Sequence, residues 1–244
     1  MRMMAPSHAM TGVLTGVAAT FVAAPLLAPD LWTTATTAVL TAGAALLPDL
    51  DHPQATATRS QGPVSRAACT GVRALSARVW RATATPRDGG GWDADGTHRH
   101  LSHTVPAALL VGLVAGLVSL WWLGALLVAW LLASLALRGL FGRAARSWLA
   151  VSGVAAVVAA LAVVVADLPA WWLGALVAVG MVTHVLGDAL TPAGVPLLWP
   201  LARRGSRWWM VSTPFTLTTG TRGEKAVQVI SGAGTVSLVL LLAA

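Results

Sequence analysis

Long apolar runs are the feature of this chain that most limits its fold. Charged residues, proline and glycine separate seven such runs, at about 8–28, 31–48, 104–120, 122–137, 148–166, 170–190 and 227–243. About 20 apolar residues in a helix cross the roughly 30 Å of hydrocarbon in a bilayer, and a helix satisfies its own backbone hydrogen bonds there. The runs therefore predict an all-α fold, a polytopic transmembrane bundle of about seven spans in a single domain, 1–244.

The overall composition supports a membrane protein and restricts its chemistry. Hydrophobic residues make up 56% of the 244 residues and charged residues only 10%, whereas soluble domains contain about 25% charged residues. The single cysteine, Cys69, excludes an intrachain disulfide and a thiolate metal cluster. The run from about His8 to Ala28 is longer than the core of a signal peptide, so we interpret it as a retained first helix.

The positions of the basic residues predict the orientation of the bundle. All 16 lysines and arginines lie at Arg2 or in 53–103, 138–147 and 199–225. In a seven-span arrangement these segments share one side, and basic loops remain in the cytoplasm. We therefore expect a multi-pass protein of the cell membrane with a cytoplasmic N-terminus. We interpret the net charge of +7 as a topology signal and expect no nucleic-acid partner.

An arginine-rich cytoplasmic loop, 53–97, is inserted between the second and third predicted spans. From Val64 to Arg81 it has helical periodicity, with Arg66, Arg73 and Arg81 roughly opposite an apolar stripe. The stripe consists of Val64, Ala68, Val72, Leu75 and Val79. Such a helix is typical of binding to anionic headgroups of the inner leaflet, here through Arg66, Arg73 and Arg81. Membrane lipid is therefore the expected partner. A solvated, partly disordered linker is the alternative.

All six histidines and several aspartates fall at the predicted cytoplasmic ends of the spans. His8 opens the first run, Pro48-Asp49-Leu50-Asp51-His52 ends the second, His98-Arg99-His100-Leu101-Ser102-His103 leads into the third, and His184 and Asp188 lie near the end of the sixth. The last two residues are four apart and share one helical face. Because a bundle gathers the ends of its helices around one pocket, these residues predict a shared site.

Carboxylates and imidazoles together are typical of a site for a divalent metal. After the helix-ending Pro48 we expect Asp49 and Asp51 on the same side of an extended turn, where they repel unless a cation or a shared proton neutralises them. Such donors favour Zn, Mn or Fe, with Zn or Mn preferred, and their number suits two ions. The predicted ligands are His8, Asp49, Asp51, His52, His98, His103, His184 and Asp188. Water-facing caps and hydrogen-bonded structural histidines are the alternatives.

The order of these motifs resembles the family of LexA-regulated, membrane-bound, predicted metal-dependent hydrolases. The resemblance rests on His8, Pro-Asp-Leu-Asp-His at 48–52, His-Arg-x-x-Ser-His at 98–103, and His184-x-x-x-Asp188-x-x-Thr191-x-x-Gly194, and these motifs cover most of the chain. His100 and the length of the 53–97 insertion depart from the family pattern. The resemblance implies a hydrolase.

Three functions are consistent with such a site. The first is an enzyme that hydrolyses a phosphoester or a lipid-like substrate with a metal-activated water at the cytoplasmic face. Asp49 or Asp51 would be its catalytic base, and Arg99, Thr191 and Glu224 would support the ligands or contact the substrate. The second is a divalent-metal transporter or a metal-sensing membrane protein. Ligands gathered near one interface favour the enzyme, because transporters place theirs near the midplane. The third is a structural site that joins the helices. The oligomeric state stays open.

Overall fold

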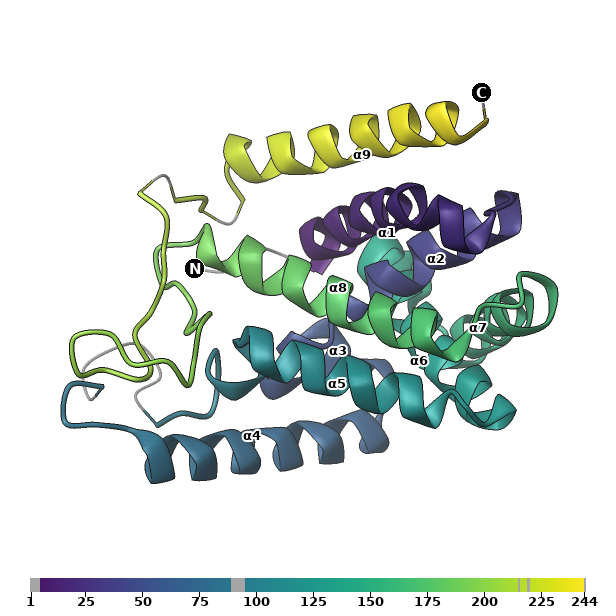
Figure 1. The fold of residues 1–244 in the computed structure, drawn as a ribbon. Coiled ribbons are helices and arrows are strands. Elements are labelled where there is room, and N and C mark those ends of the chain that lie inside the picture. The colour runs from purple at the N-terminus through teal and green to yellow at the C-terminus, as the bar shows by residue number, and fades with distance from the viewer. Residues whose placement is uncertain (1–4, 89–94, 215, 219, 244) are drawn as a thin grey trace.

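The computed structural model describes residues 5–88, 95–214, 216–218 and 220–243, and its main body is a helical bundle (Figure 1). The bundle consists of α1 (Ala5–Leu27), α2 (Leu31–Ala44), α5 (Val105–Val118), α6 (Trp122–Phe141), α7 (Trp148–Ala160), α8 (Ala170–Ala189) and α9 (Arg222–Ala243). Among these described residues there are two isolated bridges but no β-strand. The predicted all-α class is therefore confirmed.

Six helices of the described chain are long and apolar enough to cross a membrane. They cover Ala5–Leu27, Leu31–Asp51, Trp122–Ala145, Trp148–Val165, Ala170–Ala189 and Arg222–Leu242, and each corresponds to one of the predicted runs. The run predicted at 104–120 forms α5, which is apolar but has only 14 residues. Three of the six spans continue past their α-helix. Leu31–Asp51 includes the 3-10 helix η1 (Pro48–Asp51), Trp122–Ala145 includes the 3-10 helix η3 (Gly142–Ala145), and Trp148–Val165 includes the π-helix η4 (Leu161–Val165).

Polar side chains cap the starts of three helices, α2, α5 and α7. Asp30 accepts a hydrogen bond from the backbone N–H of Thr33 at 2.7 Å, and Thr104 accepts one from Ala107 at 3.2 Å. These caps satisfy N–H groups that have no partner inside the helix. Because Thr104 caps α5, the preceding residue, His103, lies just outside that helix.

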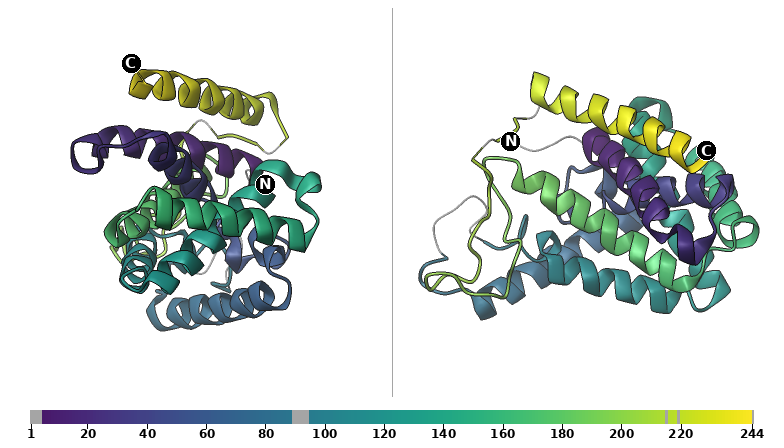
Figure 2. Two further views of the ribbon diagram at one scale, coloured as in Figure 1. Left: turned by 90° about the vertical axis from the view of Figure 1, so that its right-hand side faces the viewer. Right: turned by 45° about the horizontal axis from the view of Figure 1, so that its top comes forward.

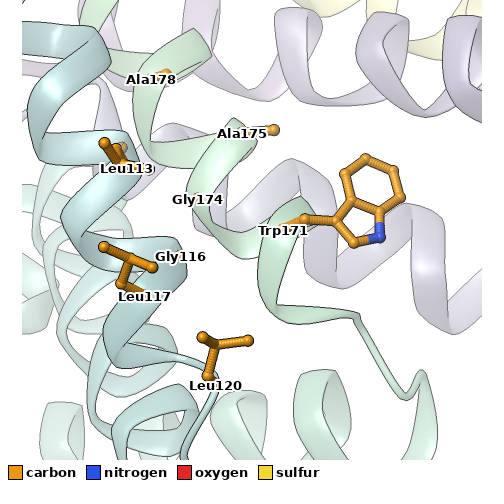
Figure 3. Close-up of a pocket in the computed structure, with 9 residues that line it drawn as sticks. Leu113, Gly116, Leu117, Leu120, Trp171, Gly174, Ala175 and Ala178 are labelled. Atoms are coloured by element: carbon orange, nitrogen blue, oxygen red, sulfur yellow. The ribbon is translucent and has the colours of Figure 1, made fainter.

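Glycine residues bring α5 and α8 into close contact (Figure 3). Gly116 of α5 lies opposite Gly174 of α8, and a methyl group on Gly174 would be 2.7 Å from the carbonyl oxygen of Gly112. Trp171 and Ala175 of α8 help to line the apolar hollow of about 380 Å³ that remains along this contact. The close approach fixes the two helices relative to each other. It therefore places the residues before α5 beside the last turns of α8.

The helix ends that carry the basic segments lie together at one end of the bundle. Glu224 at the start of α9 accepts a hydrogen bond from Ser7 of α1 at 2.8 Å, and Trp148 at the start of α7 donates one to Gln61 at 3.1 Å. This arrangement agrees with the alternation of helices that the basic segments predict. Arg2, which contributes to that prediction, lies outside the described residues.

Helix α4 (Pro63–Thr83) lies outside the bundle, on the side opposite α9 (Figures 1 and 2). It follows the short helix α3 (Thr56–Ser60) within the arginine-rich segment 53–97, of which residues 89–94 lie outside the described residues. The helix predicted from Val64 to Arg81 is therefore confirmed.

Helix α4 buries small side chains and leaves large apolar side chains exposed. Its buried residues are small, and two of the four are serines: Ser65, Cys69, Ser76 and Ala77. Ser76 accepts a hydrogen bond from the backbone N–H of Leu101 at 3.2 Å, which ties α4 to the segment before α5. Val64 and Leu75 of the apolar stripe are 73% and 54% exposed. The described part of the chain therefore leaves much of the apolar stripe of α4 uncovered.

Candidate metal site

Four helix ends contribute polar side chains to one buried cluster. His8 comes from the first turn of α1, Asp49 from η1, His103 from η2 (Leu101–His103), and His184 and Asp188 from α8. Ligand atoms lie within 4.8 Å of one another in two groups, His8 with His184 and Asp188, and Asp49 with His103 and His184. Apart from Asp49, these side chains are fully buried. The structure thus brings together five of the eight predicted ligands.

Hydrogen bonds aim the Nε2 atoms of His103 and His184 at one position. Nδ1 of His184 is 2.7 Å from the carbonyl oxygen of Ala45, so Nδ1 is the protonated nitrogen and donates. Nδ1 of His103 is 3.3 Å from Oδ2 of Asp51 and 3.0 Å from Oγ of Ser102, so it also donates. The two Nε2 atoms, which then carry the lone pairs, are 3.3 Å apart. Facing lone pairs repel unless a cation or a proton lies between them.

A proton on His103 is one way to relieve this repulsion. Burial lowers the pKa of His103, but the carboxylates of Asp51 and Asp188 raise it, and the result is a pKa of about 9. Metal ligands must be deprotonated, so an ion bound at this position would displace that proton.

Two carboxylates border the same position at distances that suit a metal. Oδ2 of Asp188 is 3.5 Å from Nε2 of His103 and 3.7 Å from Nε2 of His184, and Oδ1 of Asp49 is 3.9 Å from Nε2 of His184. Tetrahedral ligands at zinc bond lengths are about 3.3–3.6 Å from one another. The three distances among His103, His184 and Asp188 are therefore close to those in a tetrahedral coordination shell, and Asp49 lies beside His184.

Asp188 is held in place from several sides. The guanidinium of Arg99 lies 2.9 Å from Oδ2 of Asp188 and donates to Oγ1 of Thr191 at 2.8 Å. Thr191 in turn donates to the carbonyl oxygen of Asp188 at 2.7 Å. His8 stacks on His184, with ring centroids 3.8 Å apart, and its Nε2 is 3.4 Å from Oδ1 of Asp188. Arg99 and Thr191 therefore lie where the sequence predicts supporting residues.

Asp51 accepts hydrogen bonds from four donors of the segment before α5. Its oxygens lie 2.5 Å from Nδ1 of His98, 3.0 Å from the backbone nitrogen of Arg99 and 2.7 Å from Oγ of Ser102, in addition to the contact with His103. The carboxylate is completely buried. Asp51 therefore positions the two imidazoles and lies beside both ligand groups, not within either.

The expected shared orientation of Asp49 and Asp51 is wrong. Residues 48–51 form a 3-10 helix instead of an extended turn. A 3-10 helix has about three residues per turn, so residues two apart point in different directions. Asp49 accordingly faces His184, whereas Asp51 faces His98 and the segment that follows it.

Charge and unpaired atoms in the cluster fit a divalent cation. With neutral histidines, Asp49, Asp51 and Asp188 carry three negative charges, and Arg99 is the one arginine in the described chain that forms an ion pair with any of them. Of these carboxylates Asp51 and Asp188 are buried, so Arg99 leaves one buried negative charge uncompensated, which is costly in a membrane protein. Nδ1 of His8 and Oδ1 of Asp188 are buried without a hydrogen-bond partner among the described residues. Imidazole and carboxylate donors suit Zn, Mn or Fe.

Two other predicted residues lie outside both ligand groups. The ring of His52 is 5.1 Å from that of His98, and its Nδ1 accepts a hydrogen bond from the backbone of Gln54 at 3.2 Å. Glu224 accepts hydrogen bonds from Ser7 at 2.8 Å and from the backbone of Gly220 at 2.7 Å. Glu224 therefore joins the start of α9 to α1, next to His8.

Two residues that contact Asp51 were not predicted to belong to the site. Ser102 donates to its carboxylate, and Arg73 of α4 donates to its carbonyl oxygen at 3.0 Å. Ser102 stands directly before His103 in the motif, which is a signal that the sequence contains. Arg73 is 22 residues from Asp51, and no pattern in the sequence connects the two.

Comparison with known proteins agrees with a membrane location. The model of the YdjM inner membrane protein family matches residues 3–244. No match is found among curated proteins or among solved structures. The match covers nearly the whole chain, including all the residues of the cluster, and the apolar helices suit the same location. The chain therefore belongs to the YdjM inner membrane protein family.

Proposed function

We propose that this protein is a metal-dependent hydrolase of the inner membrane that acts on a phosphoester or lipid-like substrate at the cytoplasmic face. The observation that carries the proposal is the convergence of His103, His184 and Asp188, whose facing atoms are 3.3–3.7 Å apart. When bound, a divalent metal supplies a hydroxide nucleophile near neutral pH. The hydrolase activity itself is suggested by the resemblance of the motifs.

The surroundings of each residue suggest its role. We assign His103, His184 and Asp188 to the ion, with His8 and Asp49 beside them. Asp49 is the better candidate for the catalytic base, because its side chain is 16% exposed and can receive a proton from the substrate side. Asp51 is a poor candidate, since four hydrogen bonds already occupy its oxygens.

We propose one Zn or Mn ion at this site. The two ligand groups share His184, and its Nδ1 already donates to Ala45, so only one lone pair remains for an ion. A second ion would need Asp188 as a bridge, with Oδ1 facing His8. The geometry therefore favours one ion over the two that the number of candidates suggests.

We also propose seven crossings with a cytoplasmic N-terminus. Six helices have sufficient length, and α5 would be the short seventh. The support is that the starts of α1 and α5 and the ends of α2 and α8 meet in the cluster, on the side that carries the basic segments.

Metal analysis of the purified protein tests the function first. We expect about one Zn or Mn per chain in the wild type, and loss of the ion in His184→Ala and in Asp188→Asn. His52→Ala is the matched control, because it removes a nearby histidine outside both ligand groups. A folded wild type that takes up no metal on titration would contradict the proposal.

Measurements of substrate cleavage and of metal uptake then distinguish the hydrolase hypothesis from the transporter hypothesis. The metal-loaded protein is incubated with a panel of phosphoesters and esters, and metal uptake is followed in proteoliposomes. Cleavage that is lost in Asp49→Asn supports the hydrolase. Uptake of metal without cleavage of any substrate would favour the transporter.

A further inference from the structure

A large apolar cavity lies beside the candidate metal site. It has a volume of about 570 Å³ and is bordered by η1, α4, the start of α5 and α8. Its walls include Leu50, Val72, Val79, Leu101, Leu110 and Met181. Ligand pockets commonly measure about 300–1,000 Å³ and are mostly apolar. The cavity is therefore large enough for a substantial part of an apolar ligand.

The cavity and the metal cluster share their walls. Leu50 stands between the two aspartates of η1, and Met181 precedes His184 by three residues on α8. Ser102, a polar residue of the lining, donates to Asp51 at 2.7 Å and contacts His103 at 3.0 Å. A ligand that fills the cavity would therefore reach the neighbourhood of the proposed ion.

The cavity opens on a surface that would face lipid. Leu110 and Val111 of α5 are 61% and 40% exposed, and Leu75 of α4 is 54% exposed. These residues line the cavity and belong to helix faces that the described chain leaves uncovered. In a bilayer an acyl chain would enter from the membrane without passing through water.

Basic side chains lie next to this opening. A second cavity of about 450 Å³ is lined by Arg73, Arg78, Arg81 and Thr97, and it shares Leu75 with the apolar cavity. Guanidinium groups bind phosphate through paired hydrogen bonds. Arg73 also contacts the backbone of Asp51, so this basic surface is connected to the metal cluster.

We propose that the substrate is an anionic membrane phospholipid, with an acyl chain in the apolar cavity and its phosphate beside Arg73, Arg78 and Arg81. This inference rests on the proposed hydrolase and names its substrate class. Leu110 and Val79 then determine how much of the chain fits, and the arginines determine the preference for an anionic headgroup.

The test uses the full chain, loaded with zinc, in nanodiscs that contain phosphatidylglycerol with a diazirine on one acyl chain. After illumination, mass spectrometry locates the labelled residues. We expect labelling at 72–79 and 101–111 to exceed that of the lipid-exposed helix α9 several-fold. Phosphatidylcholine with the same acyl chain should label the cavity several-fold less. Equal labelling of the cavity and α9, or equal labelling by the two lipids, would overturn the proposal.

Two paired variants separate the cavity from the general membrane surface. Leu110→Trp narrows the cavity and should reduce its labelling to the level of α9. Leu109→Trp is the control, because Leu109 is similarly exposed, at 57%, but does not line the cavity. Val79→Trp narrows the cavity from the opposite wall and replaces Leu110→Trp if that variant does not fold. Labelling that persists in a folded, narrowed variant contradicts the proposal.

The metal content of the same samples distinguishes a failure of the lipid proposal from a failure of the proposed hydrolase. Zinc retained without preferential labelling of the cavity would reject the lipid and leave the hydrolase standing. Preferential labelling of a wild type that binds no zinc would overturn both, because the lipid would then occupy the cavity for another reason.

Discussion

Asp51 and Asp88 both accept several hydrogen bonds from a distant segment, yet only Asp51 belongs to a candidate site. Asp51 holds the segment before α5 against η1. Asp88 follows α4 and accepts hydrogen bonds from the backbone of Trp208 at 2.9 Å, from the backbone of Thr85 at 2.7 Å, and from Ser206. Each carboxylate thus connects parts of the chain that are far apart in sequence.

The difference lies in the donors. Two donors to Asp51 are imidazoles, and each has a second nitrogen that can bind something else. Nε2 of His103 faces His184, and Nε2 of His98 is buried without a hydrogen-bond partner among the described residues. The donors to Asp88 are backbone amides and hydroxyl groups at a partly exposed turn. Many hydrogen bonds to a carboxylate therefore do not by themselves indicate a functional site. More informative is whether its donors, like these imidazoles, have a second atom that can bind a ligand.

Asp51→Asn should produce the largest effect. The amide cannot accept from all four donors, so His103 loses the interaction that directs its Nε2 toward the ion. Loss of such an orienting contact weakens metal binding by about 10–100-fold. Competition with a zinc chelator measures the affinity, and Asp49→Asn, Asp88→Asn and wild type are compared under the same conditions. An unchanged zinc affinity in folded Asp51→Asn would mean that Asp51, like Asp88, does not support metal binding.

Asp88→Asn should have a smaller and local effect. Removing the charge weakens the hydrogen bonds that join Ser206 and Trp208 to the turn after α4, and bonds to charged groups contribute about 1.5–3 kcal/mol each. Hydrogen exchange should become about tenfold or more faster in residues 203–208, while metal affinity stays at the wild-type value. Reduced metal binding in Asp88→Asn would show that the two regions are coupled.

Acid should have the smallest effect, confined to the Asp88 turn. Burial raises the pKa of Asp88, but the hydrogen bonds from Ser206, Thr85 and Trp208 lower it, to about 2. A lowered pKa in the folded state stabilises the turn above the ordinary pKa of aspartate, and this contribution is lost as the pH falls through about 2. Exchange rates of residues 203–208, corrected for intrinsic pH dependence, should therefore rise between pH 4 and pH 2 in wild type. They should stay flat in Asp88→Asn.

Patterns along the sequence predicted most of the helices. The apolar runs correspond to seven helices, and the periodicity from Val64 to Arg81 corresponds to α4. The short length of α5 was not predicted, because the cap at Thr104 and the turn before Trp122 shorten the run. The sequence also did not indicate that Ser65 and Ser76 of α4 would be buried while Leu75 stayed exposed. Their burial depends on backbone partners that the fold alone supplies.

The chemistry of the site was determined by the sequence, and the division of roles within it by the tertiary structure. Imidazoles and carboxylates at helix ends, with one cysteine in the whole chain, restrict any metal to nitrogen and oxygen ligands. Alternating helices bring His8, His103 and His184 to one end of the bundle. Only the turn of η1 decides that Asp49 faces the proposed ion and Asp51 the histidines behind it. A spacing of two residues allows either arrangement, and the backbone angles that distinguish them depend on the packing of η1 against α3, α4, η2 and α8.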